Sequence, residues 1–399
     1  MRLASRMSTI GTESAFEVTA RARALEASGR SIVYLQIGEP DFDTPSNVRE
    51  AAKRALDEGA THYAPFPGIP PLREAIAQDA TARKHFAVTP DRVFVTVGGK
   101  GVMLYAIIGL IDPGDEAIVP DPGYPIYESL VRFVGGTPVP IPIRMANDFR
   151  LDVDELASLI TPRTRMIVIN SPANPTGGVL TRGDLERIAE LAIRHDLVVL
   201  ADEIYGRILY DETEHVSIAS LPGMADRTIV LDGFSKTFAM TGWRLGYAIV
   251  PPSLVEMYGQ LIINTISCAP TFAQIGAVEA LRGPQGPVDA MVDEFRARRD
   301  LIVDGLNAIP GIRCLRPSGA FYAFPDIGGT GLSGAELAER LLQEVGVCVL
   351  AGTAFGGVGT NHVRISYANS RANLTIALER IRGLVEPLVA AGSGSGSAR

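Results

Sequence analysis

Residues 166–202 read MIVINSPANPTGGVLTRGDLERIAELAIRHDLVVLAD, and they combine two apolar runs with an intervening helical pattern. The runs at 166–170 and 197–202 are continuously apolar, which is typical of strands that are buried on both faces of a parallel sheet. Apolar positions between Thr181 and His195 recur at helical spacing, and Thr181 with Asp184 fits an N-terminal cap. The segment therefore predicts a strand–helix–strand unit.

The same alternation continues on both sides of this unit. Further β-rich runs lie at Arg92–Val97, Glu116–Pro120, Thr228–Asp232 and Gly246–Val250. Because helical stretches separate most of these runs, the chain is predicted to be an α/β protein with a mostly parallel central sheet between helices.

The regions outside the sheet indicate a second, smaller α+β domain. Gly283-Pro-Gln-Gly-Pro287 interrupts the chain after the sheet, and a long charged helix is expected over Val288–Ala308. The polar end of the chain, GSGSGSAR, has the composition of a flexible tail. We therefore expect an N-terminal segment joining the small domain, a large domain, the small C-terminal domain and a tail, with boundaries at 1–45, 46–285, 286–390 and 391–399.

The N-terminal segment has its own expected elements. A helix is predicted at Glu17–Ser28 and a short strand at Ile32–Ile37. Thr44 followed by Pro45 fits an N-cap with proline at the first position of the next helix.

Composition excludes several classes of protein. The chain has 399 residues, 46% of them hydrophobic, which is enough apolar material for a large core and argues against a disordered chain. A net charge of −8 argues against a nucleic-acid-binding protein. The apolar runs are too short for a membrane-spanning helix, and the N-terminus does not resemble a secretory signal. Three scattered cysteines fit a reducing compartment, so we expect a cytoplasmic protein with no membrane partner.

Polar side chains follow the predicted strands at the points where they end. Asn174 follows the strand at 166–170, Asp202 ends the next strand, and Lys236 follows the strand at 228–232. Ligands of open parallel sheets bind beyond the carboxyl ends of the strands, so these groups are expected to meet. The turn Gly98-Gly99-Lys100-Gly101 leads from a strand into a helix, which is a favourable anion site.

Pyridoxal 5'-phosphate needs this combination of groups. Its aldehyde forms a Schiff base with an amine, which a crowded lysine supplies. A carboxylate keeps its pyridine nitrogen protonated, so that the ring can act as an electron sink. Its phosphate requires a helix N-terminus, hydroxyl groups and an arginine fork, and its phenolic oxygen requires neutral donors.

Three motifs carry a resemblance to a known family. They are Asn174-Pro-Thr-Gly177, Asp202-Glu-Ile-Tyr205 and the segment SKTFAMTGWRLG at 235–246. In this order and at strand ends, they make the chain similar to class I aminotransferases of the pyridoxal-phosphate fold type I superfamily, in the bacterial aspartate/prephenate-type branch. The resemblance extends from about Gly38 to Ala368.

The resemblance implies a role for each matching residue around the cofactor. Lys236 would bind the cofactor and then move the proton between the substrate Cα and the cofactor. Asp202 would pair with the pyridine nitrogen, Asn174 and Tyr205 would contact the phenolic oxygen, and Tyr124 would stack on the ring. The phosphate would be held by residues of two loops, Gly99, Lys100, Ser235 and Arg244.

Two further implications concern the partner subunit and the substrate. Tyr63 would reach the phosphate of a neighbouring subunit, which implies a homodimer with shared active sites. Arg364 would clamp the substrate α-carboxylate bidentately, with the Gly38 backbone and Asn174 beside it. The implied reaction is a ping-pong transfer of the amino group from an L-amino acid to a 2-oxo acid.

Two residues leave the choice of substrate open, because they favour different classes of amino acid. Lys100 matches the family lysine that binds a distal carboxylate, which favours aspartate or glutamate. Phe16 lies where that branch has a threonine, which favours an aromatic or aliphatic amino acid. A pyridoxal-phosphate-dependent β-lyase on the same scaffold is a further alternative.

A dinucleotide-type motif offers a different class of function. Gly329-Thr-Gly-Leu-Ser-Gly334 fits G-x-G-x-x-G, which would indicate a nicotinamide-dependent dehydrogenase. Ser333 and Glu336, however, form a capping box for a helix at Ala335–Val345, so we interpret the motif as a loop and cap. A non-catalytic regulator is disfavoured because Lys236 is present, and the five histidines show no metal-ligand spacing, so no metal site is expected.

Overall fold

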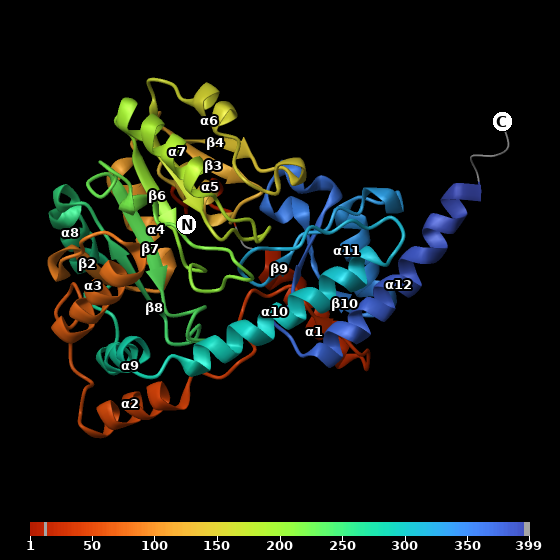
Figure 1. The fold of residues 1–399 in the computed structure, drawn as a ribbon, viewed down its shortest axis with the longest axis horizontal. Helices are drawn as coiled ribbons and strands as arrows, with labels where there is room; N and C mark the ends of the chain where they lie inside the picture. The colour runs from red at the N-terminus through yellow and green to blue at the C-terminus, as the bar shows by residue number, and fades with distance from the viewer. Residues whose placement is uncertain (12–13, 395–399) are drawn as a thin grey trace.

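The computed structural model describes residues 1–11 and 14–394, and its centre is a seven-stranded sheet (Figure 1). The strand order is β2-β8-β7-β6-β5-β3-β4, and β8 alone among these strands runs antiparallel to its neighbours. The strands are β2 (Val93–Val97), β3 (Glu116–Asp121), β4 (Thr137–Pro142), β5 (Thr164–Asn170), β6 (Val198–Asp202), β7 (Thr228–Gly233) and β8 (Leu245–Ile249). The prediction of a mostly parallel sheet is confirmed.

Strand β4 was not predicted, and its sequence explains why. It reads TPVPIP, with proline at every second position, and it lies at the edge of the sheet beside β3. Proline lacks the N–H that a central strand must donate, but an edge strand can carry it on the side that faces away from its neighbour. The prolines therefore make the segment unlike a strand in sequence, although it pairs with β3 through the residues between the prolines.

Helices cover both faces of the sheet, as the alternation of side chains along β5 requires. Met166 and Val168 pack with α4 (Gly99–Leu110), α5 (Ile126–Phe133) and α8 (Val255–Thr265). Ile167 and Ile169 point to the other face, where they pack with α6 (Val153–Leu159) and α7 (Arg182–Arg194). Farther along that face lie α3 (Pro70–Lys84) and α9 (Thr271–Arg282), with α2 (Ser46–Asp57) against α9.

A smaller α+β part lies beside the sheet, on the right of Figure 1. Helix α10 (Gly286–Asn307) crosses from the large part into it. A three-stranded sheet of β11, β12 and β9 and a pair formed by β1 and β10 pack against the helices. The elements are α1 (Ser14–Ala27), β1 (Val33–Tyr34), β9 (Tyr322–Ala323), α11 (Gly334–Val345), β10 (Val347–Cys348), β11 (Leu350–Ala351), β12 (Val363–Ser366) and α12 (Arg371–Gly394).

Pairing of β1 with β10 joins Val33 and Tyr34 to this smaller part, whereas Thr9 and Gly11 bond to Arg132 and Ser129 of α5 in the large part. The exact domain boundaries stay predictions. Helix α12 continues to Gly394, four residues into the segment 391–399 that was expected as a tail, and residues 395–399 lie outside the described part.

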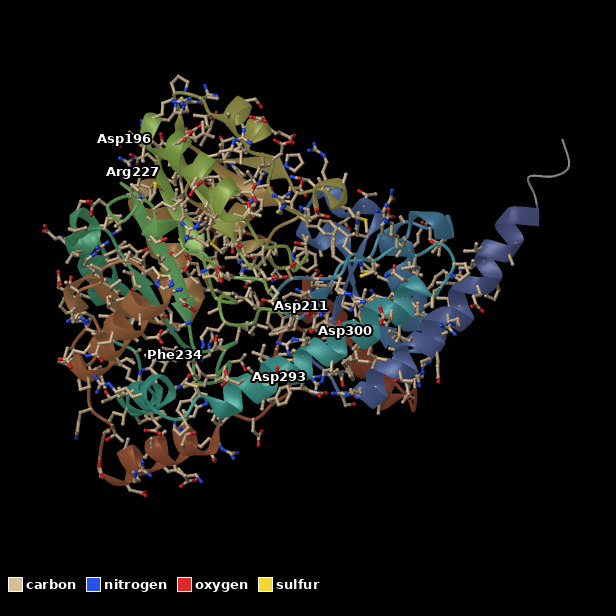
Figure 2. All side chains as sticks on the ribbon, in the orientation of Figure 1. Asp196, Asp211, Arg227, Phe234, Asp293 and Asp300 are labelled. Atoms are coloured by element: carbon tan, nitrogen blue, oxygen red, sulfur yellow. The ribbon has the colours of Figure 1, made fainter. Side chains whose placement is uncertain are left out.

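A buried arginine of α10 ties this helix to the chain after β6. Arg299 is 2% exposed, and its guanidinium contacts Asp211 at 2.7 Å and Asp300 at 2.8 Å. Figure 2 labels Asp300 on α10 and Asp211 beside it. Because Asp211 follows β6 in the chain, the pair fixes the helix against the loop that leaves the central sheet.

The local capping predictions have mixed outcomes. The box of Thr181 and Asp184 at α7 and the box of Ser333 and Glu336 at α11 are both present, so residues 329–334 form a loop and cap. The predicted Thr44 cap is wrong, because α2 begins at Ser46 and the Thr44 hydroxyl donates instead to the Ala239 carbonyl. The strand expected at 32–37 is limited to the two residues of β1. None of the described helices has the length and apolar character needed to span a bilayer.

Candidate active site

A cavity of about 540 Å³ lies beyond the carboxyl ends of β5, β6 and β7, where the central sheet meets the smaller part. Its walls come from segments that are far apart in sequence, including α1, the N-terminus of α4 and strand β12. All but one of the predicted site residues line it. They are Gly38, Gly99, Lys100, Tyr124, Asn174, Asp202, Tyr205, Ser235, Lys236, Arg244 and Arg364.

Asp202 presents a buried carboxylate at the end of β6. Its Oδ2 accepts a 2.6 Å hydrogen bond from the Tyr127 hydroxyl, and its Oδ1 accepts from the Ile204 amide at 3.2 Å. Burial raises the pKa of Asp202 to about 6, although the bonds from Tyr127 and Ile204 act in the opposite direction. Among the described residues, no cationic side chain lies within ion-pair distance of this carboxylate. The site therefore offers an acid that would be stabilised by a cationic ligand atom.

Lys236 extends from the loop after β7 toward the opposite wall. Its Nζ donates to the Gly38 carbonyl at 2.5 Å and lies 5.8 Å from the centre of the Phe321 ring. Burial lowers the pKa of Lys236 to about 8, and the nearby Arg364 and Arg244 add to this effect. A lysine in these surroundings is neutral, and hence nucleophilic, in a larger fraction of molecules near neutral pH.

Glycines and an arginine form an anion cradle at the N-terminus of α4. Gly98 caps this helix with φ 72°, a conformation that favours glycine. A Cβ on Gly98 would lie 2.4 Å from Arg244 Nη2, so the guanidinium rests directly over this turn. Arg244 Nη1 also donates to the Thr241 carbonyl at 2.8 Å. The first turn of α4, Arg244 and Ser235 thus line the cavity together, and a helix N-terminus favours an anion.

Two tyrosines form a hydroxyl pair on the other side of Asp202. The Tyr205 and Tyr322 hydroxyl oxygens are 2.7 Å apart, and the side chains are buried. Burial raises the pKa of Tyr205 well above its ordinary value, with Tyr322 contributing in the same direction. The Tyr205 hydroxyl is therefore neutral at physiological pH.

Arg364 is part of β12, and its side chain lies between two aromatic rings. Its guanidinium carbon is 4.6 Å from the centre of the Tyr322 ring and 4.7 Å from that of Phe355. Nη1 donates to Asn174 Oδ1 at 3.0 Å, and Nη2 donates to the Gln36 carbonyl. This buried, oriented guanidinium has the fork geometry that binds a carboxylate bidentately.

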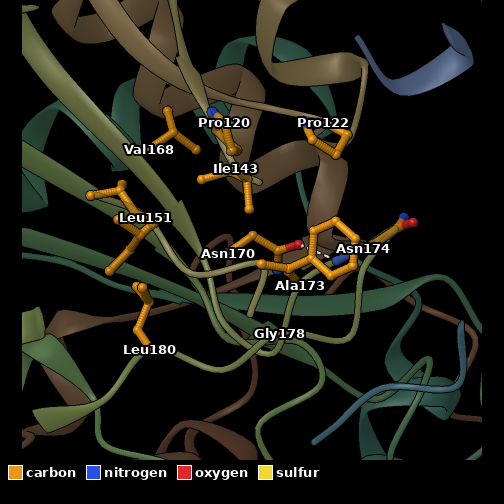
Figure 3. Close-up of a pocket in the computed structure, with 12 residues that line it drawn as sticks. Pro120, Pro122, Ile143, Leu151, Val168, Asn170, Ala173, Asn174, Gly178 and Leu180 are labelled. Atoms are coloured by element: carbon orange, nitrogen blue, oxygen red, sulfur yellow. Dashed lines mark hydrogen bonds between the residues drawn. The ribbon is translucent and has the colours of Figure 1, made fainter. Parts of the chain in front are cut away.

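The turn at Asn174 is supported from behind by packing. Asn174 N donates to Asn170 Oδ1 at 2.8 Å, and Figure 3 shows both asparagines beside a small cavity. That cavity has a volume of about 30 Å³ and mostly apolar walls such as Ile143 and Leu151. It is too small to hold a substrate, so it belongs to the packing beneath the site.

Tyr63 is the predicted residue that the structure leaves outside the cavity. Its side chain is 92% exposed. Phe66, which is 37% exposed, lies three residues farther on and approaches Gly259 of α8. Ile263, one turn along the same helix, is 51% exposed. Tyr63 is therefore an exposed side chain that does not line this chain's own cavity.

Residues that the sequence did not reveal complete the site. Tyr127 follows Tyr124 by three positions, which is the spacing of neighbours on one helix face, and that spacing was the available signal. Tyr322 and Phe355 gave no such signal, because they reach the cavity only through the fold of the smaller part. Glu39, which accepts from the Thr241 hydroxyl, also lines the wall.

Comparisons with known proteins agree with this geometry. The family model described as aminotransferase class I and II matches residues 30–381. An aspartate aminotransferase of Pyrococcus abyssi is 43% identical over 90% of this chain and 92% of its own length. An aromatic-amino-acid aminotransferase of Thermococcus litoralis is 44% identical over 89% of this chain and 92% of its own.

A solved structure shows the same fold over nearly the whole chain. The aspartate aminotransferase of Thermus thermophilus with maleate has a TM-score of 0.92 and 41% identity, and the match covers 96% of this chain and 100% of that one. The protein is therefore a pyridoxal-phosphate-dependent enzyme that belongs to the class I and II aminotransferases.

Proposed function

We propose that Lys236, Asp202 and Arg364 carry out amino transfer from an L-amino acid to a 2-oxo acid in the cavity described above. The observation that supports this most strongly is the arrangement of the three groups. A lysine of lowered pKa, a buried carboxylate and a carboxylate-binding arginine face one cavity of about 540 Å³ from three different elements. Amino transfer needs these three functions at once.

The residues present fit pyridoxal 5'-phosphate. Asp202 is a buried carboxylate of raised pKa, which a protonated pyridine nitrogen would stabilise in its ionised form. The α4 N-terminus with Arg244 and Ser235 offers donors suited to a phosphate group. The cofactor, when bound through its aldehyde, supplies the electron sink that makes the substrate Cα–H acidic.

Each polar group then has a defined task. Asp202, held by Tyr127, would keep the pyridine nitrogen protonated. The Asn174 carbonyl oxygen accepts from Arg364, so its amide nitrogen is the atom that would donate to the phenolic oxygen, together with Tyr205. Tyr124 lines the cavity 5.7 Å from the Tyr127 ring and would cover the cofactor ring.

Lys236 would move the proton of the reaction. With substrate bound, the Lys236 amine would accept the substrate Cα proton at Nζ. Its lowered pKa favours this, because a base whose pKa lies near the working pH is both unprotonated and able to accept a proton. The Gly38 carbonyl, which accepts from Nζ at 2.5 Å, orients the amine.

Substrate choice would be made where α1 and α4 meet the cavity. Lys100 and Phe16 both line it, so the two residues that favour different substrates lie in one wall. Lys100 supports an aspartate- or glutamate-type substrate, and the Phe16 ring, 67% exposed, offers an apolar contact instead. We place acidic substrates first, with aromatic or aliphatic amino acids as the second candidate.

We further propose a homodimer with shared active sites. The exposed apolar side chains of Tyr63, Phe66, Ile108 on α4 and Ile263 on α8 support an apolar subunit interface. Three free thiols at Cys268, Cys314 and Cys348 support a reducing, cytoplasmic environment.

A panel of amino donors with 2-oxoglutarate tests the proposed substrate class. Aspartate should give the highest kcat/KM, and Lys100→Met should lower the value for aspartate about tenfold while leaving phenylalanine within twofold. Phe16→Thr should act in the opposite direction. A preference for phenylalanine that Lys100→Met does not change would favour the second candidate, and release of ammonia with pyruvate would indicate a β-lyase.

A further inference from the structure

A buried cluster of charged side chains lies behind the strand ends that carry Asp202 and Lys236. Lys84, the last residue of α3, has a side chain that is 2% exposed. Its Nζ lies 2.7 Å from Glu203 Oε2 and 2.9 Å from Asp232 Oδ2. One ammonium group thus contacts two carboxylates, and neither carboxylate lines the cavity.

Neighbouring groups orient the two carboxylates. Glu203 Oε1 accepts from the Ser217 hydroxyl at 2.6 Å, and His215 Nε2 lies 3.1 Å from Glu203 Oε2. Asp232 Oδ1 accepts from the Gly233 amide at 2.7 Å. The cluster therefore joins the C-terminus of α3, the ends of β6 and β7, and the loop that contains Ser217.

Chain connectivity links this cluster to the active site. Glu203 directly follows Asp202, and Asp232 directly follows Leu231, which is the Cα partner of Asp202 in the sheet. Three buried carboxylates therefore stand at the ends of two paired strands. Gly233, whose amide donates to Asp232, is the last residue of β7 and lies three positions before Lys236.

Like charges this close oppose the ionised form of one another. Asp232 and Glu203 both raise the pKa of Asp202, after the larger effect of burial. Lys84 has the opposite effect on its partner: burial alone would raise the pKa of Glu203, but Lys84 and His215 lower it to about 2. Without Lys84, Glu203 and Asp232 would both lose the ammonium that they share, beside the acid that must stay ionised.

We propose that Lys84 is a positioning residue for the cofactor acid, whose ammonium balances Glu203 and Asp232 so that Asp202 faces the pyridine nitrogen as a carboxylate. This inference rests on the proposed role of Asp202. It assigns Lys84 a task that it performs from behind the site, since its contacts are with Glu203 and Asp232.

The test compares two cofactors that differ in one ring atom. Pyridoxal phosphate needs an anionic Asp202, whereas the analogue in which carbon replaces the pyridine nitrogen does not. Lys84→Met removes the charge and keeps most of the side-chain volume, and Lys84→Gln, which retains a donor, serves if the first variant does not fold. Lys53→Met, at an exposed lysine, is the matched control.

Dissociation constants of both cofactors are measured for the full-length protein. Lys84→Met or Lys84→Gln should weaken binding of pyridoxal phosphate about tenfold and leave the carbon analogue within twofold, because a nearby opposite charge shifts a carboxyl pKa by about one to three units. Lys84→Arg should retain the wild-type ratio. Adding Glu203→Gln to Lys84→Met restores the charge balance and should recover most of the lost ratio.

Equal weakening of both cofactors would reduce Lys84 to a structural role and overturn the inference, as would unchanged binding of both. Asp202→Asn separates this inference from the proposed function. If Asp202→Asn alters the ratio and Lys84→Met does not, only the role of Lys84 is wrong. If Asp202→Asn leaves the ratio unchanged, the proposed role of Asp202 itself is wrong.

Discussion

The Tyr127 hydroxyl donates a 2.6 Å hydrogen bond to Asp202 Oδ2, joining the first turn of α5 to the end of β6. Both side chains are buried, and the bond lowers the pKa of a carboxyl group that burial raises. The tyrosine therefore favours the ionised form of the acid on which cofactor chemistry depends.

Tyr127→Phe should shift the acidic limb of the kcat–pH profile upward by about one unit, because Asp202 loses a donor that favours its carboxylate form. The measurement is kcat at saturating substrate between pH 5 and 9, a range chosen roughly around the pKa of about 6 for Asp202. Tyr34→Phe, which removes a bond to Glu26, is the control. If the acidic limb does not move, Tyr127 does not influence the ionisation of Asp202.

Asp202→Asn should stabilise the cofactor-free protein at pH 8 while it abolishes transamination. Burial raises the pKa of Asp202 from 3.8 to about 6, so ionisation costs stability as the pH rises through this interval. The expected gain in free energy of unfolding is about 3 kcal/mol at pH 8, and it should disappear toward pH 4.

Urea denaturation at both pH values measures this gain. Asp43→Asn, at an exposed aspartate, should show no such pH-dependent difference. If Asp202→Asn is as stable as the wild type at pH 8, then burial of the ionised Asp202 carboxylate does not lower the stability of the protein.

Arg364→Lys should raise KM about tenfold or more for every amino acid, because a single ammonium cannot reproduce two parallel hydrogen bonds to a carboxylate. The loss should be common to aspartate, alanine and phenylalanine, since all share the α-carboxylate. Steady-state kinetics with these three donors measure it, with Arg49→Lys at the surface as control. A KM increase confined to aspartate would instead assign Arg364 to the side chain of the substrate.

Mixing two inactive variants tests the shared active sites. If Tyr63 reaches across the interface, each active site takes Lys236 from one subunit and Tyr63 from the other. Tyr63→Ala and Lys236→Ala then damage a site through different subunits. Random exchange of subunits then gives heterodimers with one intact site, so activity should return to roughly a quarter of the wild-type value. No recovery after subunit exchange, verified by mass measurement, would show that Tyr63 acts within its own chain.

The sequence predicted those parts of the fold and the site that depend on local pattern. Continuous apolar runs identified six strands of the central sheet, and strand-end positions identified Asn174, Asp202 and Lys236 as neighbours. The proline-rich edge strand at Thr137–Pro142 was missed because its residues individually disfavour strands.

Residues that act through distant contacts could not be found in the same way. Tyr322 meets Tyr205 across 117 positions of sequence, and Lys84 meets Glu203 across 119. Neither residue belongs to a local motif, and a buried lysine is not distinguishable by sequence from a solvated one. Their roles depend on tertiary packing, which only the structure supplies.

The central claim is that Lys236 and Asp202 hold pyridoxal phosphate in a form that accepts an amino group. A single half-reaction tests it most directly: the purified, cofactor-loaded protein is mixed with aspartate without any 2-oxo acid, and the absorbance of the aldehyde form is followed. The account predicts conversion to the amine form with one oxo acid released per active site, and a loss of several orders of magnitude in rate for Lys236→Ala. A wild-type protein that binds no chromophore, or a Lys236→Ala variant that converts at the normal rate, would contradict it.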